Sequence, residues 1–103
     1  MRYTCAMRVE KTDAYRDWID GLKDHAGRAR ILMRVDRLIH GNPGSHRHLT
    51  EGVSELKVDV GPGYRVYYSQ RGERLLLLIA GGDKSSQAKD IAKALELARN
   101  FVE

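Results

Sequence analysis

The sequence has few of the features that would tie it to a membrane, an oxidising compartment or a cysteine-based metal site. Only Cys5 is a cysteine among the 103 residues, so neither a disulfide framework nor a cysteine metal cluster can form. No apolar run approaches the length of a membrane span. The N-terminal residues are too polar for a signal peptide. We therefore expect a cytoplasmic protein without membrane contact.

Signatures of several enzyme classes are also missing. The chain has no GxxxxGK[ST] phosphate loop, no HExxH zinc motif, no nucleotide fingerprint and no Ser-His-Asp order. Internal repeats and low-complexity segments are absent too. With 42% hydrophobic and 31% charged residues, the composition is ordinary for a folded protein. The length predicts one domain, which we assign to residues 1–103.

The charge balance is basic, with a net charge of +4 and a pI near 9.4. Basic domains of this size often meet nucleic acid, because neutralising phosphates releases counterions. The same charge could also serve only to keep a small protein in solution. The placement of the cations along the chain therefore has to decide between these interpretations.

Hydrophobic periodicity predicts an α+β domain in the order β-α-α-β-β-β-α, with an antiparallel or mixed sheet packed against helices. Alternation or apolar runs predict strands at residues 3–9, 53–60, 64–69 and 74–80. Helical spacing predicts helices that begin after caps at Thr12 or Asp13 and at Asp24, and a third from residue 85 or 86. Residues 40–52 read as a polar loop.

Polar side chains collect on one face of the two strands that flank the Gly-Pro-Gly turn. A tight turn would place Asp59 opposite Arg65 and Lys57 opposite Tyr67, with Glu55 on the same face. Cations can hold a phosphate and stabilise the charge of a phosphoryl-transfer transition state, and a carboxylate can accept a proton. An ordinary solvated sheet face with cross-strand pairs would have the same pattern.

A second candidate site lies at the junction between the apolar strand and the last helix. Gly81 and Gly82 break the apolar pattern, and Lys84 follows at the helix entrance. Free backbone N–H groups and the helix dipole favour an anion at such a place, and Lys89 could extend a basic strip. Alternatively, the glycines only end the strand, and the serines that follow cap the helix.

Further cations and histidines have less specific patterns. Three arginines recur at i, i+4 and i+7 on the second helix, a stripe that can track a phosphate backbone, meet an acidic partner or face water. The cations that we consider for contacts with nucleic acid are Arg30, Arg34, Arg37, Arg47 and Arg71. In HRHL, His46 and His48 could chelate a metal, but no carboxylate or cysteine set completes a site, so we expect none. His48 could act as an acid or base beside Lys57.

The segment from Gly52 to Ala98 contains GYRVYY followed by LLLIAGGDKSSQ, and it resembles the addiction-module killer proteins of the RelE/ParE toxin superfamily, in the HigB-like branch. The earlier run WIDGLKDHAGRARILMRVDRLIHGNPG is similar to that group's N-terminal helix pair. The resemblance implies a RelE-like fold, a cognate antitoxin partner, and cleavage of messenger RNA in the ribosomal A site, which inhibits translation. In that reaction the RNA 2′-hydroxyl attacks the neighbouring phosphate, without a metal or small-molecule cofactor.

The resemblance also implies site residues. Arg65 matches the arginine expected at the scissile phosphate, Lys57 matches the basic position on the preceding strand, and Lys84 lies near a basic residue after the apolar strand. Residues that could support catalysis are Glu55, Tyr67, His48 and Lys89. The chain departs from the pattern in having no tyrosine after Tyr68 and no histidine after His48, where RelE-like toxins place a proton donor or stacking group.

Two other functions fit the same resemblance. A ParE-like toxin would poison DNA gyrase without nuclease chemistry, because a fold does not determine a function. A non-catalytic member would bind an antitoxin or RNA and cleave neither. The cations expected on the sheet face favour the endoribonuclease. The absence of a C-terminal tyrosine or histidine is consistent with a non-catalytic binding module.

Overall fold

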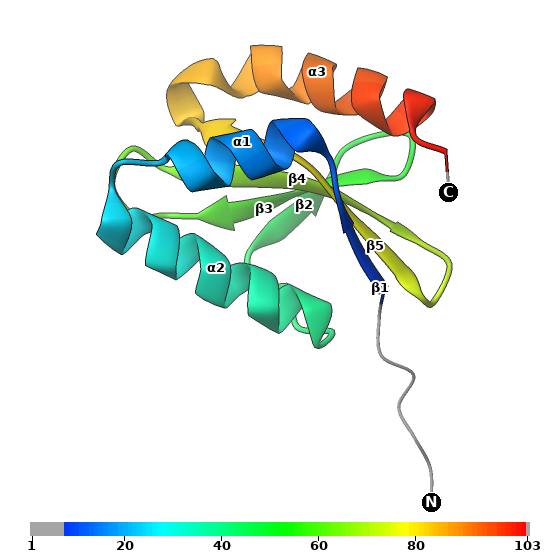
Figure 1. The fold of residues 1–103 in the computed structure, drawn as a ribbon, viewed down its shortest axis with the longest axis horizontal. Coiled ribbons are helices and arrows are strands. Elements are labelled where there is room, and N and C mark those ends of the chain that lie inside the picture. Colours follow the sequence, from blue (N-terminus) through cyan, green and yellow to red (C-terminus); the bar gives the residue numbers. More distant parts are fainter. Residues whose placement is uncertain (1–7, 103) are drawn as a thin grey trace, which may run out of the picture.

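The computed structural model describes residues 8–102, which form an α+β fold with a five-stranded mixed sheet flanked by helices (Figure 1). The elements in chain order are β1 (Arg8–Lys11), α1 (Asp13–Gly21), α2 (His25–Ile39), β2 (His46–His48), β3 (Val53–Val58), β4 (Tyr64–Arg71), β5 (Leu75–Asp83), the 3₁₀-helix η1 (Lys84–Ser86) and α3 (Gln87–Asn100). The predicted α+β class with a mixed sheet is confirmed, and the order of elements contains one strand, β2, more than predicted. The first strand, predicted at residues 3–9, falls largely outside the described residues.

The strand order in the sheet is β1-β5-β4-β3-β2. β1 runs parallel to β5, and the other neighbouring pairs are antiparallel. β2 lies within the segment that we predicted as loop, so that prediction is wrong at residues 46–48. These three exposed polar residues have no hydrophobic alternation, and their extended backbone is stabilised by pairing with β3.

Each face of the sheet is covered by helices and has its own apolar core. α1 and α2 cover one face, and their core contains Tyr15, Ile31, Leu56 and Val66. α3 covers the other face through residues that include Ala94, Ala98, Tyr67 and Ile79. The apolar part of β5 is buried on both faces, as its continuous hydrophobic run predicts.

The register of β3 and β4 differs by two residues from the predicted one. Lys57 is opposite Arg65, and Glu55 is opposite Tyr67. The difference arises because the connection is a five-residue loop at residues 59–63 and not a tight turn. Within this loop Gly61 and Gly63 have φ angles of 53° and 81°. A shift of two residues keeps every side chain on its predicted face, since side chains alternate with a period of two.

Gly81 and Gly82 do not break β5, which continues to Asp83. A Cβ atom on Gly81 would lie within 3.0 Å of the Trp18 indole ring, and one on Gly82 would collide with Asp90. A glycine inside a strand often marks such close approach. The predicted break is therefore wrong: the glycines let α1 and α3 pack closely on the two faces of this strand end.

The helix starts agree with the predicted caps. The Thr12 hydroxyl accepts a hydrogen bond from Tyr15 N at 3.1 Å, and Asp24 accepts one from Gly27 N at 3.0 Å. Helical spacing in α3 predicts a core stripe that includes Ala88, Ala92 and Ala98, but Ala88 and Ala92 are exposed while Ala94 and Ala98 are buried. Among the helices of residues 8–102, none is both long and apolar enough to cross a membrane.

Candidate functional site

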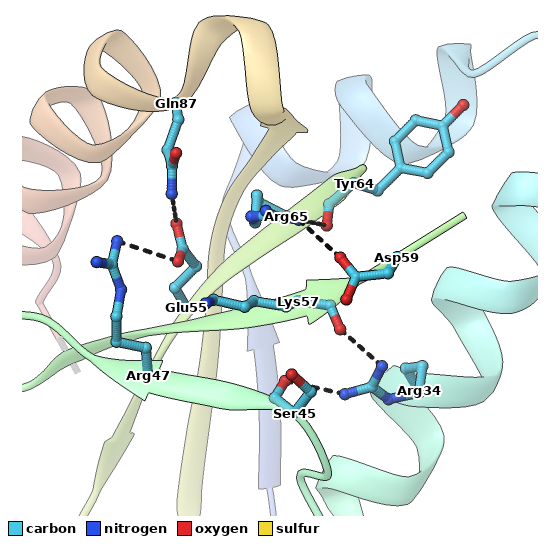
Figure 2. A network of polar contacts seen from close by, with 9 residues as sticks. All are labelled: Arg34, Ser45, Arg47, Glu55, Lys57, Asp59, Tyr64, Arg65 and Gln87. Carbon is cyan, nitrogen blue, oxygen red and sulfur yellow. Dashed lines mark hydrogen bonds and ion pairs between the residues drawn. The ribbon is translucent and has the colours of Figure 1, made fainter. Parts of the chain in front are cut away.

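Two cations face each other directly across the β3–β4 pair. Lys57 and Arg65 are register partners, and they lie on the α3 side of the sheet near the N-terminal end of that helix (Figure 2). Like charges directly opposite each other in a sheet are destabilising. The Asp59 carboxylate, 3.6 Å from Arg65 Nη1, offsets part of this repulsion, and a bound anion near both side chains would offset more of it.

Arg65 is held in place but keeps a free donor. Its side chain is 8% exposed, and Nη1 donates to the Tyr64 carbonyl oxygen at 3.1 Å. The same nitrogen lies 3.6 Å from the exposed Asp59 carboxylate. Its buried Nε has no hydrogen-bond partner within residues 8–102. A guanidinium presents its donors in a planar fork that matches two oxygens of a phosphate.

The side chain of Glu55 connects β2, β3 and α3. Its side chain is fully buried, and its Oε2 accepts a hydrogen bond from Gln87 Nε2 at 2.7 Å. Its Oε1 lies 3.2 Å from Arg47 Nη2, so β2, β3 and α3 all meet at this carboxylate (Figure 2). Buried charges need such partners because desolvation is costly. Glu55 is therefore a structural anchor for the site.

Tyr67 lies on the expected face, but α3 covers it. The ring is fully buried in the α3-side core, so the predicted solvated face is wrong at this position. The hydroxyl has no hydrogen-bond partner within the described part of the chain. Burial raises the pKa of Tyr67, and the negative charge of Glu55 raises it further. The phenol therefore stays neutral at physiological pH and keeps its O–H proton as a hydrogen-bond donor.

Lys84 stands beside the cation pair. It is the first residue of η1, and Asp83 before it is paired with Tyr64. A Cβ atom built on Gly63 would lie 3.5 Å from Lys84 Cβ and 3.6 Å from Arg65 Nη1, so both residues border the same glycine. The start of the Lys84 side chain therefore lies close to Arg65, whose register partner is Lys57. Lys89 is exposed in the first turn of α3, farther along the same helix entrance.

His48 does not join this group. It pairs with Ser54 on β3, whereas Arg47 pairs with Glu55. Adjacent strand residues point to opposite faces, so His48 lies on the α2 side and Lys57 on the α3 side. The geometry therefore contradicts the prediction that His48 acts beside Lys57.

The arginines of α2 do not form a uniform free stripe. Arg34 donates to the carbonyl oxygens of Lys57 at 2.7 Å and Ser45 at 3.0 Å (Figure 2). It also donates to the carbonyl oxygen of Pro43 at 2.9 Å. Arg30 and Arg37 are exposed. The central arginine of the predicted stripe therefore fixes the loop between α2 and β2.

The other two predicted contact residues also have structural partners. Arg47 is ion-paired with Glu55. Arg71, at the far end of β4, donates to the Ala98 carbonyl oxygen at 2.7 Å and lies over the Phe101 ring. Arg47 therefore borders the candidate site, while Arg71 attaches the end of α3 to the sheet.

Sequence reasoning missed Gln87 and the Asp24–Tyr64 contact. Gln87 follows η1 and holds Glu55, and nothing in its sequence position indicates that contact. Tyr64 donates to Asp24 Oδ2 at 2.7 Å, which links the start of α2 to the start of β4. This bond contributes most to a raised Tyr64 pKa of about 12, and with the Gly27 N–H it lowers the pKa of Asp24.

Comparison with known proteins gives a family but no activity. No family model matches the chain. An uncharacterized protein of Haemophilus influenzae is 39% identical over 95 residues, which are 92% of this chain and 96% of the relative. Identity of this extent over nearly the whole of both chains shows common descent and a common fold. The chain belongs to the same family as this Haemophilus influenzae protein.

Proposed function

We propose that this protein is the toxin of a type II toxin–antitoxin system, and that it inhibits translation as a ribosome-dependent endoribonuclease of RelE-like fold. The observation that carries the proposal is the directly opposed pair of Lys57 and Arg65. Within residues 8–102, the exposed Asp59 is the ion-pair partner of Arg65, Lys57 has no ion pair, and the buried Nε of Arg65 has no hydrogen-bond partner. A phosphodiester is the anion that both residues would accept.

The proposed reaction uses the RNA, a water molecule and the cations of the chain. The RNA 2′-hydroxyl gives its proton to water as its oxygen attacks the adjacent phosphorus, the bond to the 5′-oxygen breaks, and that oxygen receives a proton from Lys84. The products are a 2′,3′-cyclic phosphate and a free 5′-hydroxyl. Negative charge builds up on the phosphoryl oxygens during attack, and fixed cations stabilise that charge more than they stabilise the substrate. Arg65 and Lys57 would have this role.

The neighbouring residues take distinct parts in the proposal. Lys84 borders Arg65 and is exposed, so it is the candidate that protonates the leaving oxygen. Glu55 is fully buried and engaged by Gln87 and Arg47, which makes it a positioning residue. Tyr67 is fully buried beneath α3, so its neutral hydroxyl would support the site from inside the protein without contacting the phosphate. Arg30 and Arg37 remain candidates for ribosome contacts because they are exposed.

The decisive experiment is a short induction of the protein in a bacterial host, followed by mapping of RNA ends that carry a 5′-hydroxyl. The unaltered protein should arrest growth and produce new 5′-hydroxyl ends within coding regions. Arg65→Lys and Lys57→Gln should reduce cleavage by about 10²- to 10³-fold, the usual cost of removing one transition-state stabiliser. Arg16→Gln, which removes an exposed cation of α1, should leave cleavage unchanged.

Urea unfolding of the purified variants separates a lost site from a lost fold, because Arg65 is buried. Growth arrest with intact messenger RNA would contradict the proposal, and that is the outcome expected of a gyrase-directed toxin. Normal growth in cells that contain the folded protein would favour a non-catalytic binding module. A folded Arg65→Lys variant with undiminished cleavage would show that the site is assigned wrongly.

A further inference from the structure

Two histidines of β2 face a hollow on the side of the sheet opposite to Arg65. The hollow has a volume of about 480 Å³, and its lining includes His46, His48, Leu38, Ser54 and Tyr68. His46 pairs with Leu56 of β3, a residue of the α1/α2 core, and His48 pairs with Ser54. The two histidines therefore share one face of an exposed edge strand.

The Nδ1 nitrogen of each imidazole ring already lies within hydrogen-bonding distance of another group of the chain. His46 Nδ1 lies 2.7 Å from the Gly44 carbonyl oxygen, which can only accept, so Nδ1 carries the proton in the neutral ring. His48 Nδ1 lies 2.8 Å from the Ser54 hydroxyl, which can accept the same kind of bond. Such contacts orient the imidazoles that bind metal ions and leave the Nε2 lone pair for the ion.

The spacing of the rings fits coordination of one ion. Their centroids lie 5.4 Å apart, with an interplanar angle of 80°. Two imidazoles on one tetrahedral zinc ion, each with a metal–nitrogen distance of about 2.1 Å, have centroids about 5.3 Å apart. The edge-on arrangement of the rings therefore already has the separation that a shared ion requires.

We propose that His46 and His48 bind one nitrogen-preferring transition-metal ion, such as Zn²⁺ or Cu²⁺, at the mouth of this hollow. Among the described residues no three His, Cys, Asp or Glu side chains gather around a common point. The remaining coordination positions are therefore open to water or to donor atoms of a bound molecule. Mg²⁺ and Ca²⁺ are excluded because they require oxygen ligands. This site is independent of RNA cleavage.

Isothermal titration of the untagged full-length protein with ZnCl₂ tests the proposal. One ion should bind per chain, and Cu²⁺ should bind more tightly than Zn²⁺. His46→Ala or His48→Ala should weaken binding by more than about tenfold. Ser54→Ala leaves both rings but removes the oxygen beside His48, and it should weaken binding by about tenfold. His25→Ala removes an exposed histidine at the start of α2 and should have no effect.

The proposal is overturned if the unaltered protein binds no Zn²⁺ or if both β2 variants retain its affinity. It is also overturned if His25→Ala abolishes binding or if Mg²⁺ competes on equal terms. Circular dichroism of the variants establishes that they are folded, which is expected because both β2 histidines are exposed. The shift of the His46 and His48 side-chain NMR signals on Zn²⁺ addition gives a second readout for the unaltered chain.

Discussion

Gly81→Ala should destabilise the protein because the indole of Trp18 occupies the space of the missing side chain. A Cβ atom there would lie within 3.0 Å of three ring atoms, closer than real Cβ contacts allow. The ring cannot move freely, since it packs against Tyr15 with centroids 6.1 Å apart and against Tyr64 at 6.4 Å. The backbone of Gly81 is also fixed, because it pairs with Val66 inside the sheet.

The expected magnitude follows from two opposing terms. Overpacking a filled core costs about 1–3 kcal/mol, while replacing a strand glycine recovers about 0.5–1 kcal/mol of backbone entropy. The free energy of unfolding should therefore fall by about 1–2 kcal/mol, a measurable part of the roughly 5–15 kcal/mol typical of small domains. Urea unfolding followed by tryptophan fluorescence and circular dichroism measures the change.

Gly21→Ala is the matched control, because Gly21 ends α1 and a Cβ atom added there would have no other atom within 4 Å. Alanine at this position should be neutral or stabilise the protein by up to about 1 kcal/mol. The collision itself is tested by repeating Gly81→Ala in a Trp18→Leu background, where the cost should shrink. An unchanged urea midpoint for Gly81→Ala, or the same cost without the indole, would refute the reasoning.

Two further predictions concern the α2 side of the molecule. Arg34→Ala removes three hydrogen bonds to carbonyl oxygens and should lower the free energy of unfolding, measured by urea unfolding, by about 2 kcal/mol. Arg37→Ala, at an exposed position, should change this free energy by less than about 0.5 kcal/mol. Equal effects of the two substitutions would contradict the role assigned to Arg34. The pKa of Asp24 is lowered mainly by the Gly27 N–H and also by the Tyr64 hydroxyl. The ionised Asp24 therefore contributes its full stabilisation of the folded state at neutral pH. That stabilisation is lost as the pH falls through the lowered pKa, below the ordinary value of about 3.9. Asp24→Asn should therefore be less stable than the unaltered protein at neutral pH, with a difference that shrinks in acid; a constant difference in urea midpoints across that range would count against it.

Local chemistry made much of the fold predictable. The caps at Thr12 and Asp24 are short-range signals, and the structure confirms them. The continuous apolar run of β5 correctly predicted burial on both faces. The register of β3 and β4 was not predictable to the residue, because a five-residue loop and a tight turn preserve the same face alternation.

The candidate site was also predictable only in part, because strand alternation determines the face of a side chain but not its partner on the next strand. Alternation placed Lys57 and Arg65 on one face, but their direct opposition depends on loop length. The role of Glu55 as an anchor depends on Gln87, 32 positions away in the chain. His48 and Lys57 were expected near each other, and the pairing of β2 with β3 placed them on opposite faces.

The sequence by itself determined the fold class, the helix starts and the residues that share each strand face, because propensity, capping and periodicity act over a few neighbouring residues. Only the tertiary structure decided that α3 covers the polar face of the sheet and buries Tyr67. It also decided that Gly81 lies against Trp18 and that His46 and His48 share a hollow. These are contacts between distant segments, and they are selected by the packing of the whole chain.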